Sequence, residues 1–142
     1  MFVKLFGATL LFACGAFYAR GARERAEKEL FEAERAHLLV LRIKNEIADY
    51  GVPLNEILKS FGVDGGVESF LSSLSCERIM DSLADLRLIG YGYGKEELRI
   101  CDRLLESLEV LKKEMAVRLR EVTAISRVKG YGLAAAAVIF FI

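Results

Sequence analysis

The chain has 142 residues, with 20 basic and 20 acidic side chains and a formal net charge of zero. This length allows one domain at most, and the balanced charge argues against an electrostatic nucleic-acid binder, which concentrates basic residues on one face. The three cysteines, Cys14, Cys76 and Cys101, show no Cys-x-x-Cys spacing. We therefore expect no disulfide framework and a reducing compartment.

The first predicted element is an apolar helix at the N-terminus. Residues 5–19 carry no charge. A helix over residues 2–19 extends about 27 Å, just short of the roughly 30 Å hydrocarbon core of a bilayer. Tyr18 lies where an interfacial aromatic side chain belongs. Residues 1–19 are therefore predicted to be a transmembrane anchor.

Two alternatives stay open for this segment. A short basic stretch before an apolar run is also typical of a cleaved signal peptide. Leu11-Phe12-Ala13-Cys14 resembles a lipobox, in which Cys14 would carry the lipid. Phe12 is bulky for that position, and the apolar run before it is short, so we expect the anchor to be retained.

The next predicted element is a long helix from Arg20 to Asp49, which contains no proline. Apolar residues recur at spacings of three and four, which predicts one buried face. Gly51 suits the left-handed position after the helix, so the helix is expected to end at Tyr50. The predicted face consists of Leu30, Ala33, His37, Leu41, Lys44 and Ala48, widened by Leu38 and Ile47.

Three short helices are predicted in the centre of the chain. Pro53 is expected to open the first helix, and Gly62 is expected to end it. Asp64-Gly65-Gly66 predicts a turn before the second helix, and Ser75 is expected to cap the third. The three predicted helices cover residues 54–61, 67–74 and 76–89.

Gly90-Tyr91-Gly92-Tyr93-Gly94 is predicted to form a corner between helices, with its tyrosines packed on neighbouring elements. A phosphate-binding loop is disfavoured, because this stretch follows a helical pattern rather than a strand. No Gly-Lys-Ser or Gly-Lys-Thr follows it either. The glycines therefore indicate a change of chain direction.

The last predicted helix has the clearest pattern of apolar spacing. Its apolar stripe is broader than a two-position seam, which suits a face buried against more than one helix. Lys112 interrupts the pattern and is expected to extend its ammonium group from the edge of the core. The apolar positions are Leu98, Cys101, Leu105, Leu108, Met115, Leu119 and Val122, with Leu104, Leu111 and Ile125 alongside.

The C-terminal residues 130–142 form a second uncharged segment. Its helix would extend about 20 Å, too short to cross a bilayer unaided, so it is predicted to be a short membrane segment. The positive-inside rule then places residues 20–129 in the cytoplasm and both termini outside. The flanking basic residues that indicate this orientation are Arg20, Arg23, Arg25, Lys28, Arg118, Arg120, Arg127 and Lys129.

The predicted fold class is therefore all-α: a membrane-anchored antiparallel helical hairpin or bundle, with the short helices capping its far end. The sequence contains few candidate catalytic residues. His37 is the only histidine, and its apolar surroundings predict a packed, hydrogen-bonded side chain rather than a ligand or base. Glu96 and Glu97 suit a helix start through the macrodipole. No metal spacing is present, so we expect no enzyme and no cofactor.

Two stretches resemble the stage III sporulation protein AB family of endospore-forming bacteria. Residues 43–58, Ile-Lys-Asn-Glu-Ile-Ala-Asp-Tyr-Gly-Val-Pro-Leu-Asn-Glu-Ile-Leu, are similar to a helix of that family that ends in Tyr-Gly and continues into Pro-Leu. Residues 93–97 lie where the family has a corner before its last helix. Glu97 stands at the family's Asp position and Cys101 at its Gln position. The order of anchor, charged body and apolar tail also agrees.

This resemblance implies a non-enzymatic scaffold in the mother-cell membrane, within the secretion-like complex that links mother cell and forespore. It implies a helical domain related to the cytoplasmic domains of F-type platform proteins of type II secretion. The implied partners are a cytoplasmic ATPase and the other membrane subunits of the complex. Loops that reach a cytosolic partner are candidate docking surfaces: Tyr50, Gly51, Pro53, Leu54, Gly90 and Gly94.

Other classes stay open beside this one. A generic membrane-anchored envelope or division scaffold usually keeps one uninterrupted heptad pattern, which residues 50–94 break. A lipoprotein attached through Cys14 would place the body outside the cytoplasm. An enzyme that uses the glycine-rich corner would bind nucleotide through residues 20–129, and we expect no such binding. The oligomeric state is open as well.

Overall fold

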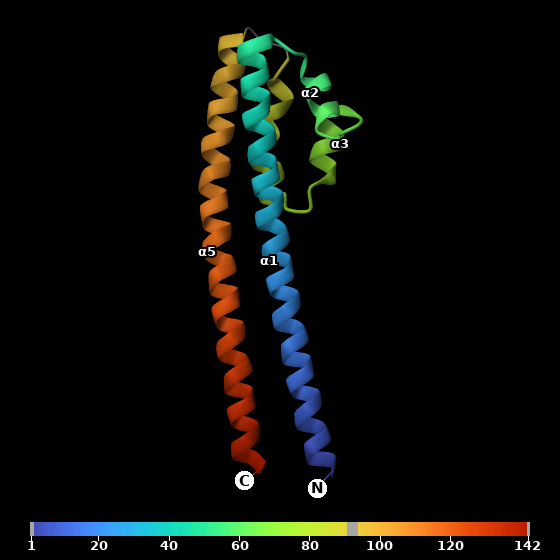
Figure 1. The fold of residues 1–142 in the computed structure, drawn as a ribbon, viewed down its shortest axis with the longest axis vertical. Coiled ribbons are helices and arrows are strands. Elements are labelled where there is room, and N and C mark those ends of the chain that lie inside the picture. Colours follow the sequence, from blue (N-terminus) through green and yellow to red (C-terminus); the bar gives the residue numbers. More distant parts are fainter. Residues whose placement is uncertain (1, 91–93, 142) are drawn as a thin grey trace. The chain divides into compact units, whose positions relative to one another are not determined.

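The computed structural model describes residues 2–90 and 94–141, and every regular element in those ranges is a helix (Figure 1). The predicted all-α class is confirmed. The chain forms two compact units, which we call the body (residues 29–114) and the terminal unit (residues 1–28 and 115–142). The elements are α1 (Phe2–Tyr50), α2 (Leu54–Ser60), α3 (Gly66–Ser73), α4 (Glu77–Ser82), the 3₁₀-helix η1 (Ala84–Leu88) and α5 (Gly94–Phe141).

Glycines end the helices around α2 as the sequence predicts. α1 ends at Tyr50, and Gly51 follows it with φ of +62°. Pro53 is the N-cap of α2, and Gly62 has φ of +78° shortly after that helix ends. Both glycines occupy the left-handed region, which side chains with a Cβ atom rarely adopt.

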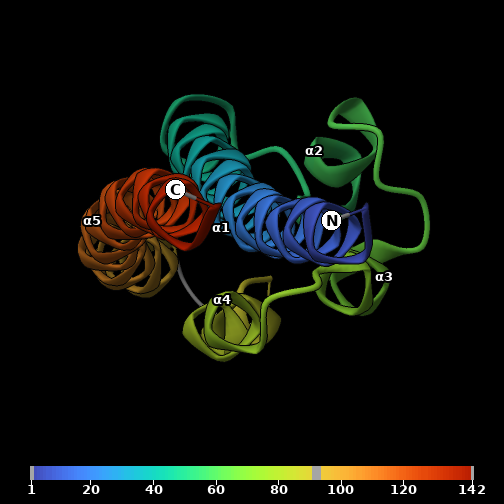
Figure 2. The same ribbon diagram turned by 90° about the horizontal axis from the view of Figure 1, so that it is seen from below.

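The five α-helices of the body surround a common interior (Figure 2). Each contributes large side chains that are almost fully buried, so the body has a hydrophobic core of its own. From α1 these are Leu39, Val40 and Ile43; from the short helices Leu58, Phe70, Leu71, Ile79 and Leu86, with Leu83 between α4 and η1; and from α5 Cys101, Leu104 and Leu108.

The buried face of α1 differs from the predicted face. Leu38 and Leu41 are 58% and 38% exposed, whereas Leu39 and Val40 are fully buried beside Ala36. Residues 38–41 are all apolar, so spacing alone cannot locate the centre of so wide an arc. The face of α5 is predicted better, because Cys101, Leu104, Leu108, Leu111 and Met115 are all buried.

Ser75 does not cap the third short helix, and the short helices do not cap the far end of α1. Cys76 is the N-cap of α4, without a side-chain bond, and the predicted helix divides into α4 and η1. The backbone N–H and the hydroxyl of Ser75 instead donate hydrogen bonds to the Glu32 carboxylate, at 3.1 and 2.6 Å. Glu32 lies about 27 Å before the end of α1. The short helices therefore extend alongside α1 (Figure 1).

Ion pairs connect the elements of the body at its surface. Lys44 of α1 pairs with Asp102 of α5, and the charges of Lys112 and Glu109 on α5 act on His37 of α1. Arg78 pairs with Glu114 and so joins α4 to α5. Exposed pairs of this kind each stabilise a fold by at most about 1 kcal/mol.

The terminal unit has the opposite distribution of apolar side chains. Ala26 and Met115 are buried, but the large apolar residues near the N-terminus point outward, with Phe6 70% and Phe17 75% exposed. Among the described helices, α1 is the one whose apolar stretch has the length and composition to cross a membrane. None of that stretch is buried within the protein.

Candidate functional site

Three of the predicted docking residues lie together in one pocket of the body. Pro53, Leu54 and Gly90 line a cavity of about 590 Å³, which we call the Pro53–Gly90 pocket. Pro53 and Leu54 begin α2, and Gly90 follows η1, so the fold brings together two loops that are 36 residues apart. The other lining residues are Asn55, Gly65, Val67, Glu68, Arg87 and Ile89.

A two-point ion pair forms the polar wall of this pocket. The Nε–H and Nη2–H groups of Arg87 donate to the two carboxylate oxygens of Glu68, at 2.5 and 3.0 Å. This hydrogen bonding, together with the negative charge of Glu68, raises the pKa of Arg87. A fork-to-fork pair fixes both planes, so the wall that joins α3 to η1 has a defined shape.

Gly90 is also held by a hydrogen bond to α5. Its backbone N–H donates to an oxygen of Glu97 at 2.8 Å. Gly90 has φ of +102°, and Glu97 lies in the first turn of α5. The Glu97 carboxylate therefore binds the corner that precedes its own helix, in addition to its favourable place at a helix N-terminus.

The remaining predicted docking residues do not line the pocket. Tyr50 is 79% exposed, and Gly51 and Gly94 are exposed as well. The predicted packing of Tyr91 and Tyr93 falls on residues 91–93, outside the described residues. Sequence reasoning missed Asn55, Glu68 and Arg87, because a contact across 19 residues leaves no periodic signal.

His37 and Cys101 are the groups of the body with chemically informative environments. Burial lowers the pKa of His37, and the nearby charge of Lys112 lowers it further, while Glu109 acts in the opposite direction. Burial raises the pKa of the Cys101 thiol to about 11, assisted by Asp102 and Glu97. Cys101 is therefore a neutral thiol in the core near pH 7. Within residues 2–90 and 94–141, no group of three or more His, Cys, Asp or Glu side chains is arranged to hold a metal ion.

The two units carry opposite net charges, although the net charge of the whole chain is zero. The terminal unit contains nine basic and three acidic residues, a formal charge of +6. The body contains 11 basic and 17 acidic residues, a formal charge of −6. Such a separation favours contact with an anionic surface at the terminal unit and with a basic surface at the body.

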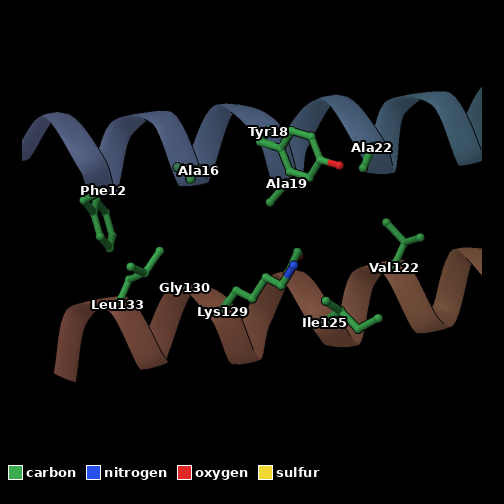
Figure 3. Close-up of a pocket in the computed structure, with 12 residues that line it drawn as sticks. Phe12, Ala16, Tyr18, Ala19, Ala22, Val122, Ile125, Lys129, Gly130 and Leu133 are labelled. Carbon is green, nitrogen blue, oxygen red and sulfur yellow. The ribbon is translucent and has the colours of Figure 1, made fainter. Parts of the chain in front are cut away.

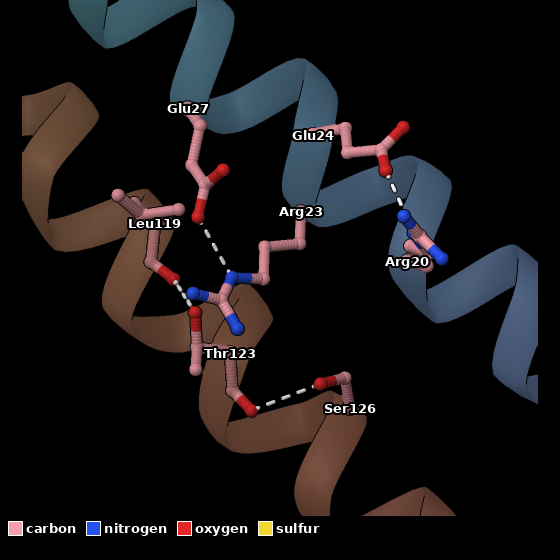
Figure 4. Close-up of polar contacts among 7 residues, drawn as sticks. All are labelled: Arg20, Arg23, Glu24, Glu27, Leu119, Thr123 and Ser126. Atoms are coloured by element: carbon pink, nitrogen blue, oxygen red, sulfur yellow. Dashed lines mark hydrogen bonds and ion pairs between the residues drawn. The ribbon is translucent and has the colours of Figure 1, made fainter.

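Part of the basic charge in the terminal unit is paired within α1. Arg20 contacts Glu24 and Arg23 contacts Glu27, each at 2.8 Å and one helical turn apart (Figure 4). On α5, the Thr123 hydroxyl donates to the Leu119 carbonyl and the Ser126 hydroxyl to the Thr123 carbonyl. Both hydroxyls therefore donate to backbone carbonyl groups of their own helix and need no hydrogen-bond partner from another element.

Comparison of the chain with known protein families, curated proteins and solved structures returned no match. The stage III sporulation resemblance therefore stays a prediction based on residues 43–58 and 93–97. Three features of the fold bear on function: the exposed apolar stretch of α1, the opposite net charges of the two units and the Pro53–Gly90 pocket.

Proposed function

We propose that this chain is a membrane-attached scaffold whose helical body docks a cytoplasmic protein. The observation that carries the proposal is the composition of α1. One uninterrupted helix contains an exposed apolar stretch at residues 2–19 and a fully buried core face at Leu39, Val40 and Ile43. A helix satisfies its own backbone hydrogen bonds and is therefore compatible with lipid. Lipid accounts for the first stretch, and the packed body accounts for the second.

The basic residues next to the apolar stretch give the orientation. Arg20, Arg23, Arg25 and Lys28 follow residues 2–19 directly. Lys and Arg are enriched on the cytoplasmic flank of membrane helices. The body is accordingly cytoplasmic, and the N-terminus is outside. In this proposal residues 130–142 are a second, shorter apolar membrane segment, and the C-terminus is outside as well.

The Pro53–Gly90 pocket is the proposed docking surface. It lies at the end of the body where α1 ends, and its wall is fixed by the pair of Glu68 and Arg87. In the sporulation interpretation, its partner is the cytoplasmic ATPase of the complex that links mother cell and forespore. The chain then acts as a non-enzymatic platform subunit, similar in role to the cytoplasmic domains of F-type secretion proteins.

Co-purification of the ATPase with full-length chain in detergent tests this assignment. Pro53→Ser removes the ring but leaves a good N-cap for α2, and Asn55→Arg places a long charged side chain at the pocket edge. Both substitutions are expected to reduce ATPase recovery, at unchanged helicity by circular dichroism. Gly94→Ala is the matched control, because a Cβ atom there meets nothing within 4 Å and Gly94 does not line the pocket. An equal loss with Gly94→Ala, or no loss with the pocket variants, rejects the pocket as the docking surface.

A second candidate is supported by the exposure of Cys14. This cysteine is free and exposed, and it follows the lipobox-like Leu11-Phe12-Ala13. If it carries a lipid, the body lies outside the cytoplasm and the chain is an envelope lipoprotein rather than a platform subunit. Mass spectrometry of the mature protein separates the two: a chain that begins at Met1 or Phe2 excludes the lipoprotein, and a lipidated N-terminal Cys14 excludes the anchor.

A further inference from the structure

The terminal unit contains an apolar crevice between its two helices. A cavity of about 370 Å³ separates α1 residues 12–22 from α5 residues 122–133 (Figure 3). Its lining is mostly apolar. Tyr18, Ser126 and Lys129 are the lining residues with polar side-chain groups, and of these Lys129 carries a charge. Figure 3 shows the Lys129 side chain extending into the gap on the side of Tyr18 and Ala19.

Small side chains on α1 create this crevice. Gly15, Ala16, Ala19 and Ala22 form most of its α1 wall. Near its Leu133 end the two helices are close, because a Cβ atom on Gly15 would come within 3.0 Å of the Leu133 Cδ1 atom. Elsewhere a single methyl group per residue leaves the volume unfilled. Protein interiors are close-packed, and an unfilled apolar gap forfeits dispersion contacts.

The crevice extends along the direction expected for a lipid. From Phe12 to Ala19 its α1 wall lies within the apolar segment, a length of about 10 Å. The first charged residue of α1 after that segment is Arg20, and the last charged residue of α5 is Lys129. One end of the crevice therefore lies at hydrocarbon depth, and the other lies at the level of the basic side chains.

Charge complementarity selects the occupant. The terminal unit has a formal charge of +6. No described acidic side chain forms an ion pair with Lys129, which lines the cavity. Lys129 is exposed beside the cavity, and an apolar helix from a second copy would offer its ammonium group no opposite charge. A phospholipid with an anionic headgroup supplies both an acyl chain and a negative charge.

We propose that the crevice binds one acyl chain of an anionic phospholipid, whose phosphate pairs with Lys129. The proposal rests on the membrane attachment proposed above and adds a lipid preference to it. The acyl chain fills the gap that Ala16, Ala19 and Ala22 leave open. It thereby contacts both α1 and α5 where their own side chains do not meet.

Electron paramagnetic resonance with spin-labelled lipids tests the proposal on the full chain in phosphatidylcholine vesicles. Labelled phosphatidylglycerol is expected to show a larger motionally restricted fraction than labelled phosphatidylcholine. Lys129→Gln should reduce this preference about fivefold, the change expected for one lysine at an anionic surface. Lys28→Gln is the matched control, because Lys28 is a basic residue of the same unit that does not line the crevice. Its preference should be almost that of the unchanged chain.

A second variant tests the cavity itself. Ala16→Phe fills the crevice and should lower the restricted fraction of both lipids, at unchanged helicity. Equal restriction of the two lipids, or equal effects of Lys129→Gln and Lys28→Gln, overturns the lipid site. So does a disulfide that joins two chains carrying Ala16→Cys in a Cys14→Ser background, because it shows that a second copy occupies the crevice.

Vesicle flotation after alkaline carbonate extraction distinguishes failure of the lipid site from failure of membrane attachment. A chain that floats without a phosphatidylglycerol preference retains membrane attachment and loses the lipid site. A chain that does not float at all contradicts membrane attachment itself.

Discussion

The body and the terminal unit share the two long helices α1 and α5, yet large apolar side chains are buried in the body and exposed in the terminal unit. In the body, Leu39 and Leu108 are fully buried; in the terminal unit, Phe6 and Phe17 are 70% and 75% exposed. A body surrounded by water needs an apolar interior. A helix surrounded by lipid has no such need, because the lipid chains are as apolar as its side chains. This difference supports the proposal that the terminal unit is attached to a membrane.

The spaces between α1 and its neighbours lead to the same conclusion. Small residues line α1 in both units, with Ala33 and Ala36 buried in the body and Ala19 and Ala22 in the crevice of the terminal unit. In the body, Ile79 of α4 and Leu83, the residue that follows α4, help to complete the interior. The terminal unit consists of α1 and α5 alone, so its crevice stays open to an outside molecule.

The largest expected contrast comes from truncating one apolar side chain in each unit. Leu108→Ala should lower the free energy of unfolding of the body by about 3 kcal/mol, because it leaves a cavity in a packed core. Phe17→Ala should change the same quantity by less than about 0.5 kcal/mol, since that ring contributes nothing to the core. Urea unfolding of the full chain in detergent micelles, followed by circular dichroism, measures both. Equal losses would remove the distinction between the units.

A smaller effect is expected where Ser75 is tied to α1. Glu32→Gln removes the negative charge that accepts both hydrogen bonds from Ser75 and should destabilise this connection by about 1 kcal/mol. Faster hydrogen exchange at the Ser75 amide reports the change. Glu34→Gln, an exposed carboxylate two residues further along α1 that does not bond to Ser75, serves as the control. The contact is dispensable if the two variants exchange alike.

The smallest expected effect is a pH dependence from His37. Its pKa in the folded chain lies below the ordinary value of 6.5, because burial and Lys112 disfavour the charged ring. The unfolded chain therefore binds a proton more readily, so this contribution to stability is complete above pH 6.5 and declines as the pH falls through the lower folded pKa. Unfolding between pH 7.5 and 5.5 should show a shallower decline for His37→Gln. A decline that is identical in the two proteins contradicts this role.

The sequence predicts the elements of this fold better than their packing. The ends of α1 and α2 follow from Gly51, Pro53 and Gly62, whose preferences are local. The buried face of α1 does not follow, because residues 38–41 are all apolar and the neighbours decide which of them are covered. The path of the short helices depends on Ser75 and Glu32, 43 residues apart, and no spacing rule connects such a pair.

The candidate site shows the same division. Pro53, Leu54 and Gly90 could be chosen because turn residues and loops can be identified in sequence. That they line one pocket could not be predicted, because the pocket also depends on the pair of Glu68 from α3 and Arg87 from η1. The crevice at Lys129 was also beyond sequence reasoning, since its volume depends on how two antiparallel helix segments meet.

The central claim is that residues 2–19 lie in lipid while the body lies in water, and a spin label on Cys14 tests it most directly. Cys14 is exposed, whereas Cys76 and Cys101 are buried, so the label attaches selectively. In vesicles, power saturation should show a Cys14 label accessible to oxygen and protected from a water-soluble nickel chelate. A label on Asn45→Cys in a Cys14→Ser background, on the exposed surface of the same helix, should show the reverse. A Cys14 label as accessible to the nickel chelate as the Asn45→Cys label would contradict the account.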